Sequence, residues 1–131
     1  MKRIITNLVF GLLLVAGIGN VYGQKKDLGA EPEKCTQNLS LFHESVKAGN
    51  YDGAYENWKW CYDNCPKASL FIYADGLKIA ESMYKKGSDK EAASKLIDEI
   101  YTKRLVHFPK NSAKVYSDWA ISLQKRGASK D

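Results

Sequence analysis

The chain has 131 residues, carries a net charge of +5 and contains 44% hydrophobic and 27% charged residues, which is typical of one small folded domain. Its basic residues alternate with acidic ones, as in the stretches EPEK and SDKE, so the sequence lacks the one-signed basic stripe that nucleic-acid binding requires. We therefore interpret the charge as a solvated surface and expect no nucleic-acid partner.

Residues 1–23 have the layout of a secretory signal peptide. Lys2 and Arg3 precede an apolar stretch over residues 4–18, and small residues then lead to Gly23. An uncleaved anchor is the alternative, although a membrane span needs roughly 20 apolar residues. Cys35 follows two charged residues and does not fit the cleavage site of a lipoprotein.

We expect an exported mature chain that begins at Gln24, located in the periplasm or outer cell envelope or secreted, with no stable membrane insertion. Loss of Lys2 and Arg3 lowers its net charge from +5 to +3. A domain of this size buries only about two-thirds of its unfolded surface, so covalent or repeat-to-repeat support is expected.

The mature chain is predicted to be all-α, with five helices whose short turns make successive helices antiparallel neighbours. Residues 24–34 are polar and are predicted to form a flexible leader, and residues 128–131 a tail. The first helix begins at Cys35 and is closed by Gly49, because the left-handed conformation costs glycine least. Asp52 is the predicted N-cap of the second helix, which Pro66 stops.

The third helix is predicted over about residues 69–87, with apolar residues on two sides, so neighbours are expected to cover two of its faces. Ser88 and Glu91 have the spacing of a capping box at the start of the fourth helix. A fifth helix over residues 112–127 is capped by Asn111 or its neighbour Ser112.

One helix-pair unit recurs along the chain. A glycine, an alanine and a large apolar residue return after 38 residues, and a proline returns after 43: Gly49, Ala54, Trp58 and Pro66 become Gly87, Ala92, Leu96 and Pro109. These offsets predict a second copy that is about one turn longer in each helix.

This unit resembles the tetratricopeptide (TPR) repeat, a helix hairpin with fixed small and aromatic positions and a closing proline. The resemblance is carried by eight signature residues: Gly49, Tyr51, Ala54, Trp58, Pro66, Gly87, Ala92 and Pro109. Ala54 is expected to be small because the hairpin helices approach closely there, and Trp58 is expected to fill the space against the next unit. The first-helix pattern is weaker: only Leu41 fits it in the first copy, and Asp75 takes an apolar place in the second.

We interpret residues 35–66 and 67–109 as two repeats, and residues 112–127 as a capping helix or a truncated third repeat. An unrelated five-helix bundle is the alternative. Residues 35–79, about a third of the chain, are also similar to the start of an exported TPR family of Bacteroidetes, whose members are generally longer.

The three cysteines allow one disulfide. In an antiparallel hairpin the start of the first helix lies beside the end of the second, which favours a bond between Cys35 and Cys65. It closes a loop of about thirty residues and contributes about 3 kcal/mol by the chain-entropy model. The rival pair, Cys61 and Cys65, lies one helical turn apart and gains little. With the first pairing, Cys61 is a small buried apolar residue.

We expect no metal, no cofactor and no enzymatic activity. Cys61 and Cys65 offer two ligands, with only His43 and His107 to add, whereas a metal site needs three or four. The sequence has no Cys-x-x-Cys redox motif and no third group that orients a Cys–His pair. The histidines are interpreted as surface or groove residues.

The TPR resemblance implies a module that binds a protein or peptide partner, because the first helix of each TPR repeat lines a concave surface. That register gives ten groove candidates in this chain: Thr36, Leu39, His43, Val46, Leu70, Tyr73, Leu77, Lys114, Ser117 and Ile121. Core packing is the alternative role for the apolar members.

A structural role is the second hypothesis. An exposed apolar face on the last helix, around Tyr116, Trp119 and Leu123, would favour self-association or docking onto further repeats of a longer chain. A terminal repeat ordinarily needs a polar outer face to stay soluble.

Overall fold

The computed structural model describes residues 26–127, so the predicted signal peptide and the tail at 128–131 lie outside the described residues. The described chain is all-helical, with five helices in sequence: α1 (Pro32–Lys47), α2 (Tyr51–Asn64), α3 (Phe71–Lys86), α4 (Lys90–His107) and α5 (Ser112–Lys125). None of these helices combines the length and the apolar character needed to cross a bilayer.

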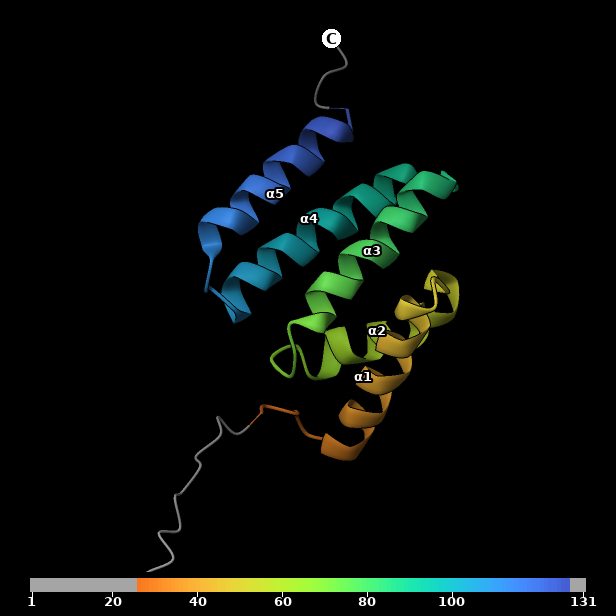
Figure 1. The fold of residues 1–131 in the computed structure, drawn as a ribbon, viewed down its shortest axis with the longest axis vertical. Helices are drawn as coiled ribbons and strands as arrows, with labels where there is room; N and C mark the ends of the chain where they lie inside the picture. The colour runs from red at the N-terminus through yellow and green to blue at the C-terminus, as the bar shows by residue number, and fades with distance from the viewer. Residues whose placement is uncertain (1–25, 128–131) are drawn as a thin grey trace, which may run out of the picture.

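The helices form hairpins that stack in a TPR-like arrangement. α1 pairs with α2, α3 pairs with α4, and α3 packs against both helices of the first hairpin. α5 packs along α4 and makes no close backbone contact with α3. Figure 1 shows this order, with α4 between α5 and α3 and the first hairpin across the lower half of α3.

Glycines close the first helix of each hairpin, as predicted. Gly49 and Gly87 have φ angles of +75° and +74°, a left-handed conformation that glycine adopts at little cost. The predicted N-caps of the second helices were wrong by one or two residues. Asn50, and not Asp52, caps α2 by accepting from Gly53 N, and Asp89, and not Ser88, caps α4 by accepting from Ala92 N.

Two predicted lengths also differ from the structure. α1 begins at Pro32 rather than Cys35, because proline fits the first turn, where its missing N–H leaves no intrahelical bond unmade. α4 has 18 residues and α2 has 14, which is the predicted extra turn, but α1 and α3 both have 16. The second repeat is therefore longer only in its second helix.

The end of the predicted leader packs against the domain. Leu28 is half-buried against the core, and a Cβ added at Gly29 would lie 2.5 Å from the Asn64 carbonyl oxygen. Residues 28–31 therefore pack along the end of α2, immediately before α1 begins in the sequence.

The core is centred on Trp58 of α2, which is fully buried between the two hairpins. Its Nε1–H donates to the Ile72 carbonyl at 2.7 Å, and a Cβ added at Gly76 would lie 2.6 Å from that nitrogen. Ala54 is also fully buried, as its small size predicted. Trp60 lies on the flank, half-buried, with Lys34 Nζ 4.8 Å from its ring centre.

Candidate functional site

A groove between α3 and α5, with α4 as its floor, contains two adjoining hollows. We call it the α3/α5 groove. The first hollow has a volume of about 280 Å³ and extends from Leu70 and Leu77 of α3 to Lys114 of α5. The second, of about 300 Å³, lies farther along the same helices, between Tyr84 and Ile121. The hollows share Tyr101 and Asp118, so they form one elongated depression.

The floor of the α3/α5 groove is apolar and rigid. Tyr101 is 5% exposed and its ring stacks on Trp119 at a centroid distance of 5.7 Å. Burial, with the carboxylates of Glu81 and Asp118 nearby, raises the pKa of the Tyr101 phenol, which therefore stays uncharged. A neutral aromatic floor favours apolar side chains of a ligand over water.

Charged side chains line the walls of this groove. Acidic residues lie near its middle, at Glu81 and Asp118, and basic residues lie toward both ends. Lys114 is paired with Asp118 at 2.6 Å. Arg104 donates from Nη2 to the Lys110 carbonyl at 3.2 Å, whereas its Nη1 is buried and has no hydrogen-bond partner within residues 26–127. Arg104 lines the first hollow, but this buried nitrogen is not exposed to it.

The structure places the ten groove candidates in three groups. Four line the α3/α5 groove with side chains that are at least partly exposed: Leu70, Leu77, Lys114 and Ile121. Tyr73 is only 1% exposed and Val46 only 5%, so the prediction that they present side chains to a ligand was wrong. Both helices that carry them are covered from two sides, and these positions face the core. Thr36, Leu39, His43 and Ser117 do not line the α3/α5 groove.

His43 instead joins α1 to α3. Its Nδ1 lies 2.6 Å from Asp75 Oδ2, and its ring lies 4.0 Å from the Phe71 ring, centre to centre. The Asp75 side chain is 3% exposed, so this pair supplies the partner that a buried carboxylate requires. Asp75 occupies an apolar position of the TPR pattern because a side chain on the neighbouring helix compensates for its polarity.

A polar cluster at Asp98 anchors α5 to α4. Trp119 Nε1–H donates to Asp98 Oδ1 at 2.7 Å, and Arg126 Nη2 lies 2.5 Å from the same oxygen. Burial by itself would raise the pKa of Asp98, but the bonds from Arg126 and Trp119 outweigh it and hold the pKa below its ordinary value. Trp119 therefore faces α4, which corrects its assignment to the exposed face of the last helix.

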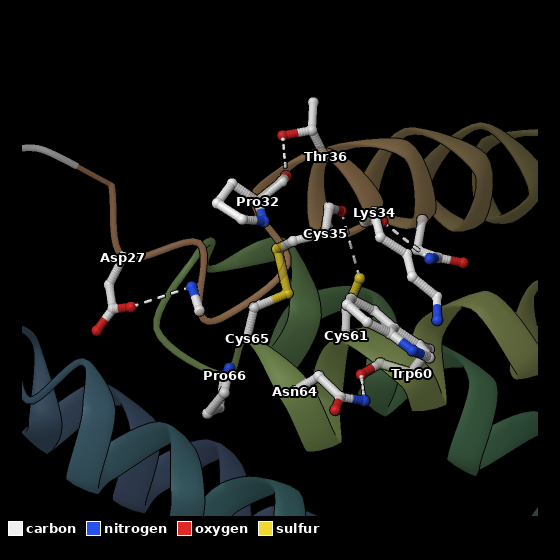
Figure 2. Close-up of a disulfide and its surroundings, with 12 residues drawn as sticks. Asp27, Pro32, Lys34, Cys35, Thr36, Trp60, Cys61, Asn64, Cys65 and Pro66 are labelled. Atoms are coloured by element: carbon white, nitrogen blue, oxygen red, sulfur yellow. Dashed lines mark hydrogen bonds between the residues drawn. A yellow bond between two sulfur atoms is a disulfide. The ribbon is translucent and has the colours of Figure 1, made fainter.

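The predicted disulfide between Cys35 and Cys65 is present, with a Cα–Cα distance of 6.3 Å. Cys61 is a buried free thiol, as expected. The three Sγ atoms lie within 4.8 Å of one another, the only such group of potential metal ligands in residues 26–127 (Figure 2). The structure places neither His43 nor His107 with these cysteines.

The floor of the groove is formed by residues of α4 that were not among the predicted groove candidates. Ile97, Tyr101 and Arg104 lie on one face of α4 at spacings of four and three, and that spacing was visible in the sequence. None of the three was a groove candidate, because the TPR register assigns the concave surface to first helices only.

No family model, no curated protein and no solved structure matches this chain.

Proposed function

We propose that this protein is an exported, non-enzymatic TPR-like module of the bacterial cell envelope that binds an extended segment of a partner protein in the α3/α5 groove. The observation that supports it is the pair of adjoining hollows over Tyr101, lined by apolar residues and rimmed by charges. Exposed apolar surface within a concave site is typical of peptide recognition.

The shape of the groove indicates which kind of ligand it accepts. Two hollows along one axis accept apolar side chains from an extended chain, and Leu70 and Ile121, 48% and 47% exposed, are the apolar residues available to contact them. The flanking lysines and acids set the direction in which the segment lies.

The test is selection of peptides from a random displayed library against the mature chain, followed by titration calorimetry with the selected sequences. We expect enrichment of peptides with spaced apolar residues, which lose binding to the double variant Leu70→Asp, Ile121→Asp. A matched variant, Leu41→Asp with Val106→Asp, changes two exposed apolar residues outside the groove and should bind as the wild type does. Equal binding by both variants would contradict the proposal.

A second candidate function is self-association through the outer face of α5. Tyr116 and Leu123 are 57% and 41% exposed, and Ala120 between them is exposed as well. A second copy of the chain would bury this stripe by pairing α5 with α5. Sedimentation equilibrium over a wide concentration range tests it: a mass that rises with concentration and falls again in Tyr116→Ser supports the dimer, and a constant monomer mass contradicts it.

A further inference from the structure

Three cysteines meet where the start of α1 lies beside the end of α2. Cys35 and Cys61 are 0% exposed and Cys65 is 1% exposed, and their sulfur atoms all lie within 4.8 Å of one another. Figure 2 shows the Cys61 sulfur beside the Cys35–Cys65 bond rather than turned away from it. The disulfide uses two of these sulfurs, so the group becomes a set of three ligands only when that bond is reduced.

The start of α1, the end of α2 and the segment before α1 surround the three sulfurs. Cys35 lies in the first turn of α1, and Cys61 and Cys65 lie one turn apart at the end of α2. The Cys61 thiol donates to the Cys35 carbonyl oxygen at 3.6 Å, which directs its sulfur toward α1. Gly29 covers the site from outside, because a Cβ there would lie 3.4 Å from Cys65 Cβ.

The distances suit a single shared ion. Sulfurs that bind one ion at about 2.3 Å are about 3.5–4 Å apart, so shifts of about 1 Å complete such a site. No His, Asp or Glu of residues 26–127 joins the three sulfurs as a fourth ligand. Structural zinc sites take four ligands, so this set of three does not match the preference of zinc.

Charge decides which ion fits. A buried site disfavours a net charge, and all three cysteines are buried. Three thiolates around a monovalent ion leave two negative charges, and around a divalent ion they leave one. A trivalent ion gives a neutral complex, which an apolar core accommodates without a counter-ion.

We propose that the reduced cluster of Cys35, Cys61 and Cys65 is a binding site for one trivalent thiophilic ion of the arsenic(III) class. A phosphine or a dithiol supplies two electrons to the disulfide, and protons add to the sulfurs of Cys35 and Cys65. Arsenous acid, As(OH)₃, then exchanges its three hydroxyl groups for three thiolates. Each thiol proton leaves with a hydroxyl group as water, so three As–S bonds form with no change in charge or oxidation state.

The bound ion would link α1 to α2 in place of the disulfide. Because the oxidised chain offers only the Cys61 thiol, binding depends on the redox state of the chain. This site lies in the first hairpin, away from the α3/α5 groove, and does not depend on the proposed peptide binding.

The experiment is a titration of the mature chain with arsenite after reduction by a phosphine, because a dithiol would itself chelate arsenic. We expect one arsenic per chain by native mass spectrometry, protection of all three cysteines from alkylation, and no binding to the oxidised chain. Far-ultraviolet circular dichroism checks that the reduced chain keeps its helices. Loss of the helices on reduction would overturn the proposal, since the site would no longer exist.

The matched variant is Cys61→Ala, which keeps the disulfide pair and removes one sulfur. We expect it to bind arsenite about 100-fold more weakly, because the third As–S bond forms within the complex at high effective concentration. Equal affinity of the variant and the wild type would contradict the proposal, and so would protection of only two cysteines. Stronger protection by Zn²⁺ than by arsenite at the same concentration would show that the charge argument is wrong.

Discussion

α3 and α5 both pack against α4, yet they are embedded very differently. The predicted TPR pattern aligns three positions of the two helices: Ile72, Gly76 and Ile79 in α3 with Tyr116, Ala120 and Leu123 in α5. In α3 all three are buried, with Ile72 at 0% and Ile79 at 1% exposure. In α5 all three are exposed. Residues at the same positions of the pattern thus lie in the core in α3 and at the surface in α5.

The neighbours of each helix explain this difference. α3 packs against both helices of the preceding hairpin and against its own partner α4. Among the described helices, α5 makes close backbone contacts with α4 only, and one hydrogen bond joins its end to α3, from the Tyr84 hydroxyl to the Arg126 carbonyl oxygen at 3.0 Å. Fewer contacts hold α5. The Trp119 ring stacks on Tyr101, and the side chains of Trp119 and Arg126 donate to Asp98. Burial on several sides stabilises a helix through packing, and a helix with one neighbour depends on a few specific contacts.

The largest expected effect on stability comes from truncating a buried residue of α3, and the comparison is with the aligned exposed residue of α5. Ile79→Ala should lower the free energy of unfolding by about 2–5 kcal/mol, because it leaves a cavity in the core. Leu123→Ala, at the matching exposed position, should change it by less than about 1 kcal/mol. Urea denaturation followed by circular dichroism measures both values. Similar losses in the two variants would remove the distinction between the helices.

The second pair of aligned positions, Gly76 in α3 and Ala120 in α5, tests the same difference in burial. Gly76→Ala should destabilise the fold by about 1–3 kcal/mol, since the added methyl meets the buried Trp58 ring, which has no space to move. Ala120→Gly should cost only about 1 kcal/mol, through helix propensity. A neutral or stabilising Gly76→Ala would mean that the indole does not lie against this glycine.

The smallest effect concerns the anchor of α5 and depends on pH. The pKa of Asp98 in the folded chain lies below its ordinary value of 3.8, so its contribution is fully present above that pH and is lost as the pH falls further. Asp98→Asn should therefore destabilise by about 1 kcal/mol at neutral pH and by less in acid. Unfolding curves of both chains between about pH 7 and pH 3 test this. A difference that does not change with pH would exclude a role for the carboxylate charge.

The sequence predicted the features that depend on local spacing. Apolar periodicity predicted the five helices and the glycines that end two of them, Gly49 and Gly87. Hairpin geometry predicted the Cys35–Cys65 bond. The caps of α2 and α4 were less certain from sequence because several adjacent residues can cap a helix, and the choice between Asn50 and Asp52 depends on where the turn ends.

Features that depend on which helices become neighbours were not predictable in the same way. The pairing of His43 with Asp75 requires two helices 32 residues apart to meet in one register. The burial of Val46 and Tyr73 reflects neighbours on two sides of their helices, and periodicity alone does not say which apolar residue faces a groove. Four of the groove candidates line the α3/α5 groove, but that they bind a ligand stays a prediction, and the floor from α4 depends on how α5 docks.

The measurement that tests the account most directly is residue-resolved hydrogen exchange of the mature chain at low protein concentration. If α3 is held on several sides and α5 mainly by α4, the core amides of α3 should exchange only on global unfolding. The amides of α5 should exchange through a local opening of lower free energy, which leaves the rest of the chain folded. Equal protection of α3 and α5 under these conditions would contradict the account, because it would show that α5 belongs to the same cooperative unit as the core.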